Sequence, residues 1–285
     1  MAKVAVVTDS TANIPADVLK NHPICVAPLQ VVWGDETYRD GIDIQPRQFF
    51  ERLQTTKTMP TTSQTSPAAF AEIYRPLVEE GYHILSMHIS SKLSGTYDSA
   101  MQARELFPGS RIEVVDTKTT AMAMGFQVLS AARAAAQGAT LQECCKIVEE
   151  AQKNSGVLFV VSTLEFLRRG GRIGGAAAFL GTALNLKPIL EIRDGRIEAI
   201  ERVRTMNKAI DRLLELFVDR VGNRRPVHIA SLHGNVPEAA RQLLERAQQC
   251  FDKSEISEAF LADVSPVLGT HVGPGCMGIA YMFEA

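Results

Sequence analysis

The stretch that decides the fold is YHILSMHISSKLSGTYDSA, residues 82–100. Its first part is mostly apolar and predicts a buried strand, and its last part predicts the start of a helix. A short loop of serines and a glycine joins the two. A buried strand that leads through a short loop into a helix is the unit from which parallel α/β sheets are built. Because ligands bind at the carboxyl ends of such strands, the loop also marks a candidate site.

The same unit recurs through the first half of the chain. Two alanine-rich helices follow the last of its strands and end near Asn154. This alternation predicts an N-terminal α/β domain with a parallel sheet, which we place at residues 1–156. The strands are predicted at residues 3–10, 24–33, 82–89 and 111–116, and the helices between them at residues 15–22, 46–54, 67–81 and 95–106.

The second half follows a different pattern. Residues 187–203 alternate apolar and polar side chains on either side of Asp194-Gly195, which predicts a β-hairpin. Antiparallel pairing combined with helices predicts a C-terminal α+β domain with a mixed sheet at residues 157–285. The predicted fold class is therefore α/β, with two domains. Further strands are expected at residues 156–162, 226–234, 254–262 and 276–284.

Composition and charge narrow the function classes. A hydrophobic content of 46% with 22% charged residues is typical of a globular protein, and a net charge of -2 offers no basic surface for nucleic acid. The apolar run at the N-terminus ends at Asp9, which is too short for a signal peptide or a membrane span. The five cysteines show no Cys-x-x-Cys spacing, so we expect reduced thiols and a cytoplasmic protein. The six histidines show no paired metal spacing, so no metal site is expected.

Two clusters of hydroxyl side chains are candidate anion-binding elements. The first is PTTSQTS, residues 60–66, which places Thr62 and Ser63 on a loop expected between two helices. In the second, Ser94 and Gly95 open the helix of the opening stretch. A hydroxyl can donate to a carboxylate or phosphate oxygen, a helix N-terminus favours an anion, and glycine allows close backbone approach. Taken alone, the first cluster is more typical of a solvated loop, and helix capping alone would explain Ser94 of the second.

Three further motifs allow more than one interpretation. Asp9 follows the first strand and could be a nucleophile, a metal ligand or a turn former. RRGGRIGG, residues 168–175, lacks the Lys-Ser/Thr ending of a P-loop, so nucleotide binding is not expected, and its arginines could serve a partner surface or close a cleft. His271 precedes Val-Gly-Pro-Gly and is either a core residue or a side chain that a tight loop aims at a site.

Two segments contain no Asp, Glu, Lys or Arg: residues 173–186 and residues 264–283. This composition fits a protein core and an apolar ligand tunnel equally well. No nucleophile elbow, metal cage or pair of carboxylates on one face emerges from the sequence.

An ordered set of motifs along nearly the whole chain resembles the DegV family. The set consists of VTDSTANIP, PTTSQTSP, SSKLSGTYDSA, VVDTKTTAMAMG, LRRGGRIGG, LNLKPIL, DGRI and HVGPGCMG. The resemblance implies two α/β domains with an acyl chain buried between them, and a function in fatty-acid binding. Some members of that family present the bound fatty acid to a separate fatty-acid kinase, which makes an acyl phosphate.

Matching motifs also imply site residues. Thr62 stands before Ser-Gln and Ser94 before Gly-Thr-Tyr, at family positions that hydrogen-bond the fatty-acid carboxylate. Ser63 and Gly95 belong to the same two loops, and His271 of His-x-Gly-Pro-Gly is expected to support the network. The family's first cluster often reads Ser-Gln-Pro-Ser, whereas this chain has a threonine in place of the proline, which leaves the hydroxyl donors intact.

The resemblance implies a carrier with no cofactor rather than an enzyme, with catalysis in the partner kinase. The expected ligand is a long-chain fatty acid such as palmitate, stearate or oleate, and lipid exchange implies transient membrane contact. Hydroxyl donors without an opposing arginine would hold the carboxylate less tightly than a bidentate arginine and leave it reactive. Affinity would come from the acyl tail, at about 0.8 kcal/mol per buried CH₂.

The tail is expected along residues 173–186. The partner is expected at a surface formed by Arg168, Arg169, Arg172, Arg202 and Arg204. Two other functions stay open. An enzyme for a small phosphorylated or carboxylated substrate could use Asp9 with the hydroxyl clusters, and a regulatory lipid sensor would bind a fatty acid on behalf of another partner.

Overall fold

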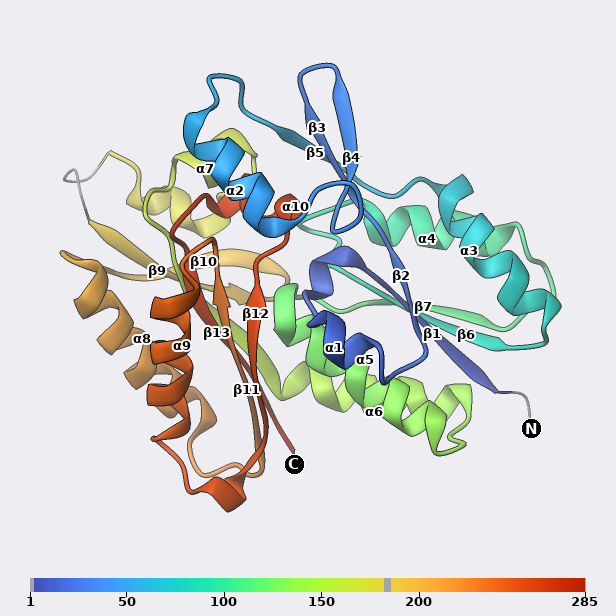
Figure 1. Ribbon diagram of the computed structural model, residues 1–285. Helices are drawn as coiled ribbons and strands as arrows, with labels where there is room; N and C mark the ends of the chain where they lie inside the picture. The colour runs from blue at the N-terminus through green and yellow to red at the C-terminus, as the bar shows by residue number, and fades with distance from the viewer. Residues whose placement is uncertain (1–2, 182–185, 285) are drawn as a thin grey trace.

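The first half of the chain forms a four-stranded parallel sheet. The computed structural model describes residues 3–181 and 186–284. The strand order is β2, β1, β6, β7, with the bounds Ile24–Ala27, Val4–Asp9, His83–His88 and Ile112–Asp116. Helices α3 (Pro67–Glu79) and α4 (Thr96–Glu105) cover one face, and α5 (Ala121–Ala136) and α6 (Leu141–Lys153) cover the other (Figure 1). The predicted alternation is present, although α1 (Ala16–Leu19) is only one turn long.

The second half forms a six-stranded mixed sheet that begins with β8 at Ser155. Helices α8 (Met206–Val221) and α9 (Pro237–Gln248) cover one face. The order is β10, β9, β8, β13, β11, β12, with the bounds Arg196–Val203, Lys187–Arg193, Ser155–Val160, Met277–Phe283, Val227–His233 and Ile256–Asp263. Asp194 and Gly195 turn the predicted hairpin with φ of 50° and 79°, as a two-residue turn between twisted strands requires.

Helix α5 lies between the two large sheets and joins them. It packs against β1 of the parallel sheet and against β8, β11 and β13 of the mixed sheet (Figure 1). Its side chains are buried along most of its length, so its alanine-rich composition reflects close packing on both sides. One hydrophobic cluster therefore runs through both halves. The division into two domains near residue 156 stays a prediction.

A third, smaller sheet corrects two predictions. Residues 24–33 are not one strand: β2 ends at Ala27, and after Pro28 the chain enters β3 (Gln30–Trp33), which belongs to a separate antiparallel sheet. Proline has no N–H for a ladder, so it interrupts the run. The first hydroxyl cluster is not simply a loop, because residues 61–63 form β5 (Thr61–Ser63) beside β3. The third strand is β4 (Glu36–Arg39).

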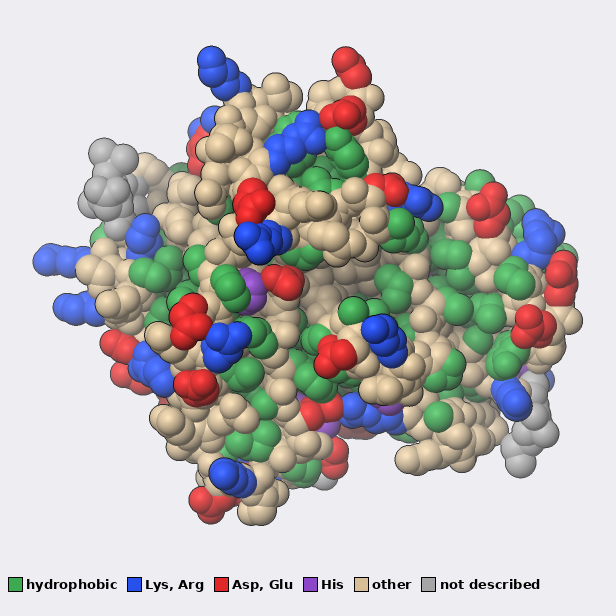
Figure 2. Space-filling view, in the orientation of Figure 1, with side chains coloured by type: hydrophobic (Ala, Val, Ile, Leu, Met, Phe, Trp, Pro, Cys, Tyr) green, Lys and Arg blue, Asp and Glu red, His purple; other side chains and the backbone are tan. Residues whose placement is uncertain are grey.

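Three further helices and three 3₁₀ turns complete the described part of the chain. Helices α2 (Pro46–Thr55) and α10 (Pro266–Val272) pack against each other, and α10 also contacts the small sheet. None of the helices within the described ranges is long and apolar enough to span a membrane. Acidic and basic side chains are interspersed on the face drawn in Figure 2, in line with the small net charge. The remaining segments are α7 (Glu165–Arg169) and the 3₁₀ turns Ser10–Ala12, Gly174–Phe179 and Lys253–Glu255.

Candidate ligand-binding site

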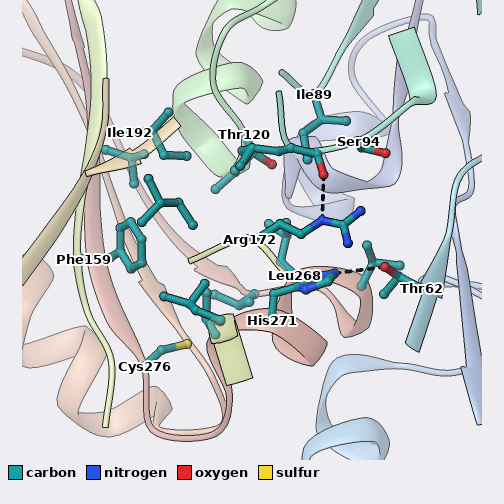
Figure 3. Close-up of a pocket in the computed structure, with 18 of the residues that line it drawn as sticks. Thr62, Ile89, Ser94, Thr120, Phe159, Arg172, Ile192, Leu268, His271 and Cys276 are labelled. Carbon is teal, nitrogen blue, oxygen red and sulfur yellow. Dashed lines mark hydrogen bonds between the residues drawn. The ribbon is translucent and has the colours of Figure 1, made fainter. Parts of the chain in front are cut away.

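A cavity of about 240 Å³ lies between the three sheets. Its polar lining includes Thr62, Ser63, Gln64, Ser94, Arg172 and His271, and most of the remaining lining is apolar. Figure 3 shows Thr62, Ser94 and Arg172 on one side of the cavity and Phe159, Ile192 and Cys276 on the other. The cavity therefore has a polar end and an apolar end, which suits an amphipathic ligand.

A hydrogen bond between Thr62 and His271 forms the centre of the polar end. Oγ1 of Thr62 on β5 lies 2.9 Å from Nε2 of His271 on α10 (Figure 3). Burial, together with the nearby positive charge of Arg172, lowers the pKa of His271 to about 4, so the ring is neutral at pH 7. In the tautomer with the proton on Nε2, the imidazole donates to Thr62, and the Thr62 hydroxyl keeps its own proton for a ligand.

Gly170 sets the position of the His271 ring. A Cβ at Gly170 would lie 2.1 Å from Nδ1 of His271, so the ring packs directly on the Cα of this glycine. Nδ1 is buried and has no hydrogen-bond partner among the described residues. The ring is therefore confined between Gly170 and Thr62.

The second hydroxyl cluster lies beside the first. Oγ of Ser94 is 2.8 Å from Oγ1 of Thr96, and Ser94 lines the cavity. Gly95, directly before α4, is not among the residues that line it. A Cβ at Gly95 would lie 2.3 Å from Oε1 of Gln64, so the glycine makes room for the side chain that follows Ser63. The structure thus brings Thr62, Ser63, Ser94 and His271 to one cavity and places Gly95 just behind it.

Arg172 corrects the expectation of a pocket without arginine. Its side chain lines the cavity, rather than the outer surface where the sequence had placed it. Nε donates to the backbone oxygen of Leu93 (3.0 Å), and Nη1 donates to that of Gly170 (2.7 Å). No sequence signal separated this arginine from its exposed neighbours Arg168 and Arg169, which pair with Glu165.

Comparison with known proteins identifies the family. The family model described as "Uncharacterised protein, DegV family" matches residues 3–284. The chain belongs to the DegV family. A DegV domain-containing protein of Streptomyces coelicolor is 42% identical over 277 residues, which are 97% of each chain.

Solved structures of DegV proteins share the whole fold. The structure of a DegV family protein from Thermus thermophilus, described by its fatty-acid binding, matches with a TM-score of 0.90 at 38% identity and covers 99% of this chain and 100% of that one. Bacillus subtilis DegV, described as a fatty acid binding protein, matches with a TM-score of 0.90 at 34% identity over 100% of both chains.

The apolar wall of this DegV chain differs from the one expected. Within residues 173–181 and at residue 186, no side chain lines the cavity, and residues 182–185 lie outside the described residues. Phe179 instead packs beneath the Arg202 guanidinium, 4.6 Å from the ring centre. Several residues of the other uncharged segment, 264–283, do line it. Much of the remaining wall comes from strands of the mixed sheet or their ends, namely Val157, Phe159, Ile192, Ile197 and Leu232.

Asp9 is sealed inside the DegV fold and is not among the cavity-lining residues. Its carboxylate accepts hydrogen bonds from the backbone and hydroxyl of Thr11, the backbone N–H of Ile89, and Nδ1 of His88. Nε2 of His88 is in turn 2.7 Å from Oγ of Ser86. This Asp-His-Ser order resembles a hydrolytic triad, but Asp9, Ser86 and His88 have no exposed surface, so the serine cannot reach a substrate.

Proposed function

We propose that this chain binds a long-chain fatty acid, with its carboxylate at the polar end of the cavity and its acyl chain against the apolar wall. The observation that carries the proposal is the Thr62–His271 pair, which presents hydroxyl donor capacity at one end of an otherwise largely apolar cavity. The DegV proteins of known structure that are described as fatty-acid binding support it. Palmitate, stearate and oleate are the candidate ligands.

The head group would be held by hydroxyl groups with help from one positive charge. Thr62, Ser63 and Ser94 can each donate to a carboxylate oxygen. Two N–H groups of Arg172 already donate to backbone carbonyls, which limits its capacity for a bidentate clamp, while its charge still favours an anion. This arrangement stabilises a buried carboxylate and leaves part of it available to a reaction partner.

We further propose that the protein is a cytoplasmic carrier that presents the fatty acid to a separate fatty-acid kinase, in which catalysis takes place. Transient membrane contact would allow lipid exchange. Exposed Arg168, Arg169, Arg202 and Arg204 are the candidate docking residues, since arginine is enriched at interface hot spots and surface charge steers association. The burial of Asp9 argues against the alternative of an enzyme that uses this carboxylate.

Native mass spectrometry of the protein purified from cells tests the ligand class. We expect an adduct whose mass is that of a long-chain fatty acid and which disappears after delipidation. Protein that is ligand-free as purified and that also fails to take up palmitate, stearate or oleate would refute the proposal. A regulatory lipid sensor is distinguished by adding a fatty-acid kinase, because a sensor would bind the lipid without supporting acyl-phosphate formation.

A further inference from the structure

Asp40 is a buried carboxylate at which chain segments from all three sheets meet. It directly follows β4 of the small sheet and is 2% exposed. Oγ of Ser10, just beyond β1 of the parallel sheet, donates to Oδ2 (2.7 Å). The backbone N–H of Val267, which follows β12 of the mixed sheet and lies at the start of α10, donates to Oδ1 (3.3 Å). Asp40 is not among the residues that line the cavity.

Helix α10 is attached to the small sheet at two points, one turn apart. The first is the bond from Val267 to Asp40, and the second is the bond between His271 and Thr62. Asp40 directly follows β4 and Thr62 lies on β5, the two strands that flank β3 in the small sheet. Between the two points, Gly269 allows the Phe50 ring to approach, since a Cβ there would lie 2.7 Å from it.

We propose that Asp40 is the positioning residue of the head-group site: by holding the start of α10, it places His271 opposite Thr62. This proposal rests on the proposed function, because it treats the Thr62–His271 pair as the place where the carboxylate binds. Asp40 acts through the helix and does not touch the ligand.

The task requires an ionised carboxylate. Oγ of Ser10 accepts from the backbone N–H of Leu29 (3.1 Å), which directs the Ser10 proton to Asp40. In a protonated Asp40 or an asparagine, one oxygen can still accept from the backbone N–H of Val267. The other group becomes a donor, and it would face the Ser10 hydroxyl, which already donates in this direction. The bond from Val267 would also lose its charge-assisted strength. Protonation therefore loosens the start of α10.

Asp40 changes its protonation state in a pH range that a binding experiment can cover. Burial raises the pKa of Asp40 to about 6, and the negative charge of Asp9 adds to this effect. In its own turn, Arg39 and Asp43 pair with each other, and on α10 the pKa of His271 is about 4. Fatty-acid affinity should consequently fall as the pH drops through 6, in a range where His271 stays neutral.

The test compares Asp40→Asn with Asp43→Asn, a matched control in the same turn whose carboxylate pairs with Arg39. Dissociation constants for palmitate and for hexadecanol, which lacks the carboxylate, are measured by calorimetry between about pH 5.5 and 7.5. Hydrogen exchange of the amides at residues 267–272 is measured on the ligand-free proteins. Should Asp40→Asn not fold, Ser10→Ala removes one of the hydrogen bonds that orient Asp40 and is measured in the same way.

At about pH 7.5, Asp40→Asn should weaken palmitate binding about five- to tenfold, the difference between a charge-assisted and a neutral hydrogen bond, and change hexadecanol binding less than about twofold. Asp40→Asn should also make palmitate affinity less dependent on pH and speed amide hydrogen exchange in α10, whereas Asp43→Asn should do neither. Equal losses for acid and alcohol, or unchanged exchange in α10, would overturn the positioning role. Wild-type protein that binds no palmitate would instead refute the proposed function, and exchange in α10 would still decide the role of Asp40.

Discussion

Replacing Gly170 by alanine should weaken fatty-acid binding without unfolding the protein. Gly170 has φ of -74° and ψ of -5°, which alanine adopts without strain. The added Cβ would lie 2.1 Å from Nδ1 of His271, whereas real contacts essentially never fall below 3.0 Å. The imidazole must therefore move by roughly 0.9 Å or more. Its opposite edge is held 2.9 Å from Thr62, so this movement breaks or distorts the head-group pair.

The expected magnitude follows from that hydrogen bond. Loss of a buried partner costs about 1–3 kcal/mol, which corresponds to a loss of affinity of about 5- to 150-fold. The added methyl group strains the folded state, but alanine also makes the unfolded chain less flexible than glycine does, which stabilises the protein by about 0.4–1 kcal/mol. The two effects oppose each other, so the melting temperature should change little. Titration calorimetry with palmitate measures the affinity, and thermal melts followed by circular dichroism measure the stability.

His271→Ala supplies the decisive control, because it removes the ring that Gly170→Ala would displace. In that background the second substitution should cost almost nothing, so that the two effects are strongly non-additive. If Gly170→Ala reduces affinity equally with and without the ring, it acts through α7 or the backbone. If it leaves the affinity of the wild-type background unchanged, the Thr62–His271 pair does not hold the head group.

Four further predictions concern the head group, the tail, the partner and pH. Thr62→Val and Ser94→Ala should each weaken palmitate binding by about 1–3 kcal/mol by calorimetry, and unchanged affinity in both folded variants would reject the assignment. Ile192→Asp should abolish binding at the apolar wall while Phe179→Asp, outside the cavity, keeps it, and the reverse would place the tail elsewhere. Arg202→Glu should slow acyl-phosphate formation by an added kinase at unchanged fatty-acid affinity, and wild-type turnover at every protein concentration would exclude this docking surface. The pKa of Asp40 is about 6 in the folded protein and 3.8 in the unfolded chain, so between these pH values the folded state binds the proton more tightly. Asp40 therefore increases the free energy of unfolding as the pH falls from 6 toward 4. This difference in pKa corresponds to roughly 3 kcal/mol in the free energy of unfolding. His271, whose pKa is lowered, has the opposite sign, so the wild-type melting temperature must be compared with that of Asp40→Asn, and a pH-independent difference would contradict the pKa.

The sequence predicts those parts of the fold that local pattern controls. The opening stretch became β6, a serine-glycine loop and α4, and Asp194-Gly195 became a hairpin turn because its conformation needs residues that tolerate positive φ. The division of residues 24–33 between two sheets was missed. Apolar periodicity does not reveal which sheet a strand joins, and the effect of Pro28 was underestimated.

The site was predicted less completely, because its wall depends on contacts between distant segments. An uncharged segment can face a cavity or a protein core, and composition alone assigned the tail to residues 173–186, which do not line the cavity where they are described. Arg172 was grouped with Arg168 and Arg169 because the three share one glycine-rich run. What separates them is the hydrogen bond from Arg172 to the carbonyl of Leu93, a residue distant in the chain, which no local pattern encodes.

The Arg172 geometry also changes the physical account of the head group. A site with hydroxyl donors alone would leave a buried carboxylate without a compensating charge, which is costly. An arginine free to form two parallel bonds would hold that carboxylate tightly and reduce its reactivity. Here the backbone oxygens of Leu93 and Gly170 occupy two of the guanidinium N–H groups, so the charge is present while the donor geometry is partly committed. In the proposed complex, the carboxylate would be stabilised mainly by the positive charge of Arg172 and by the hydroxyl groups. At least part of it would stay open to a phosphoryl donor.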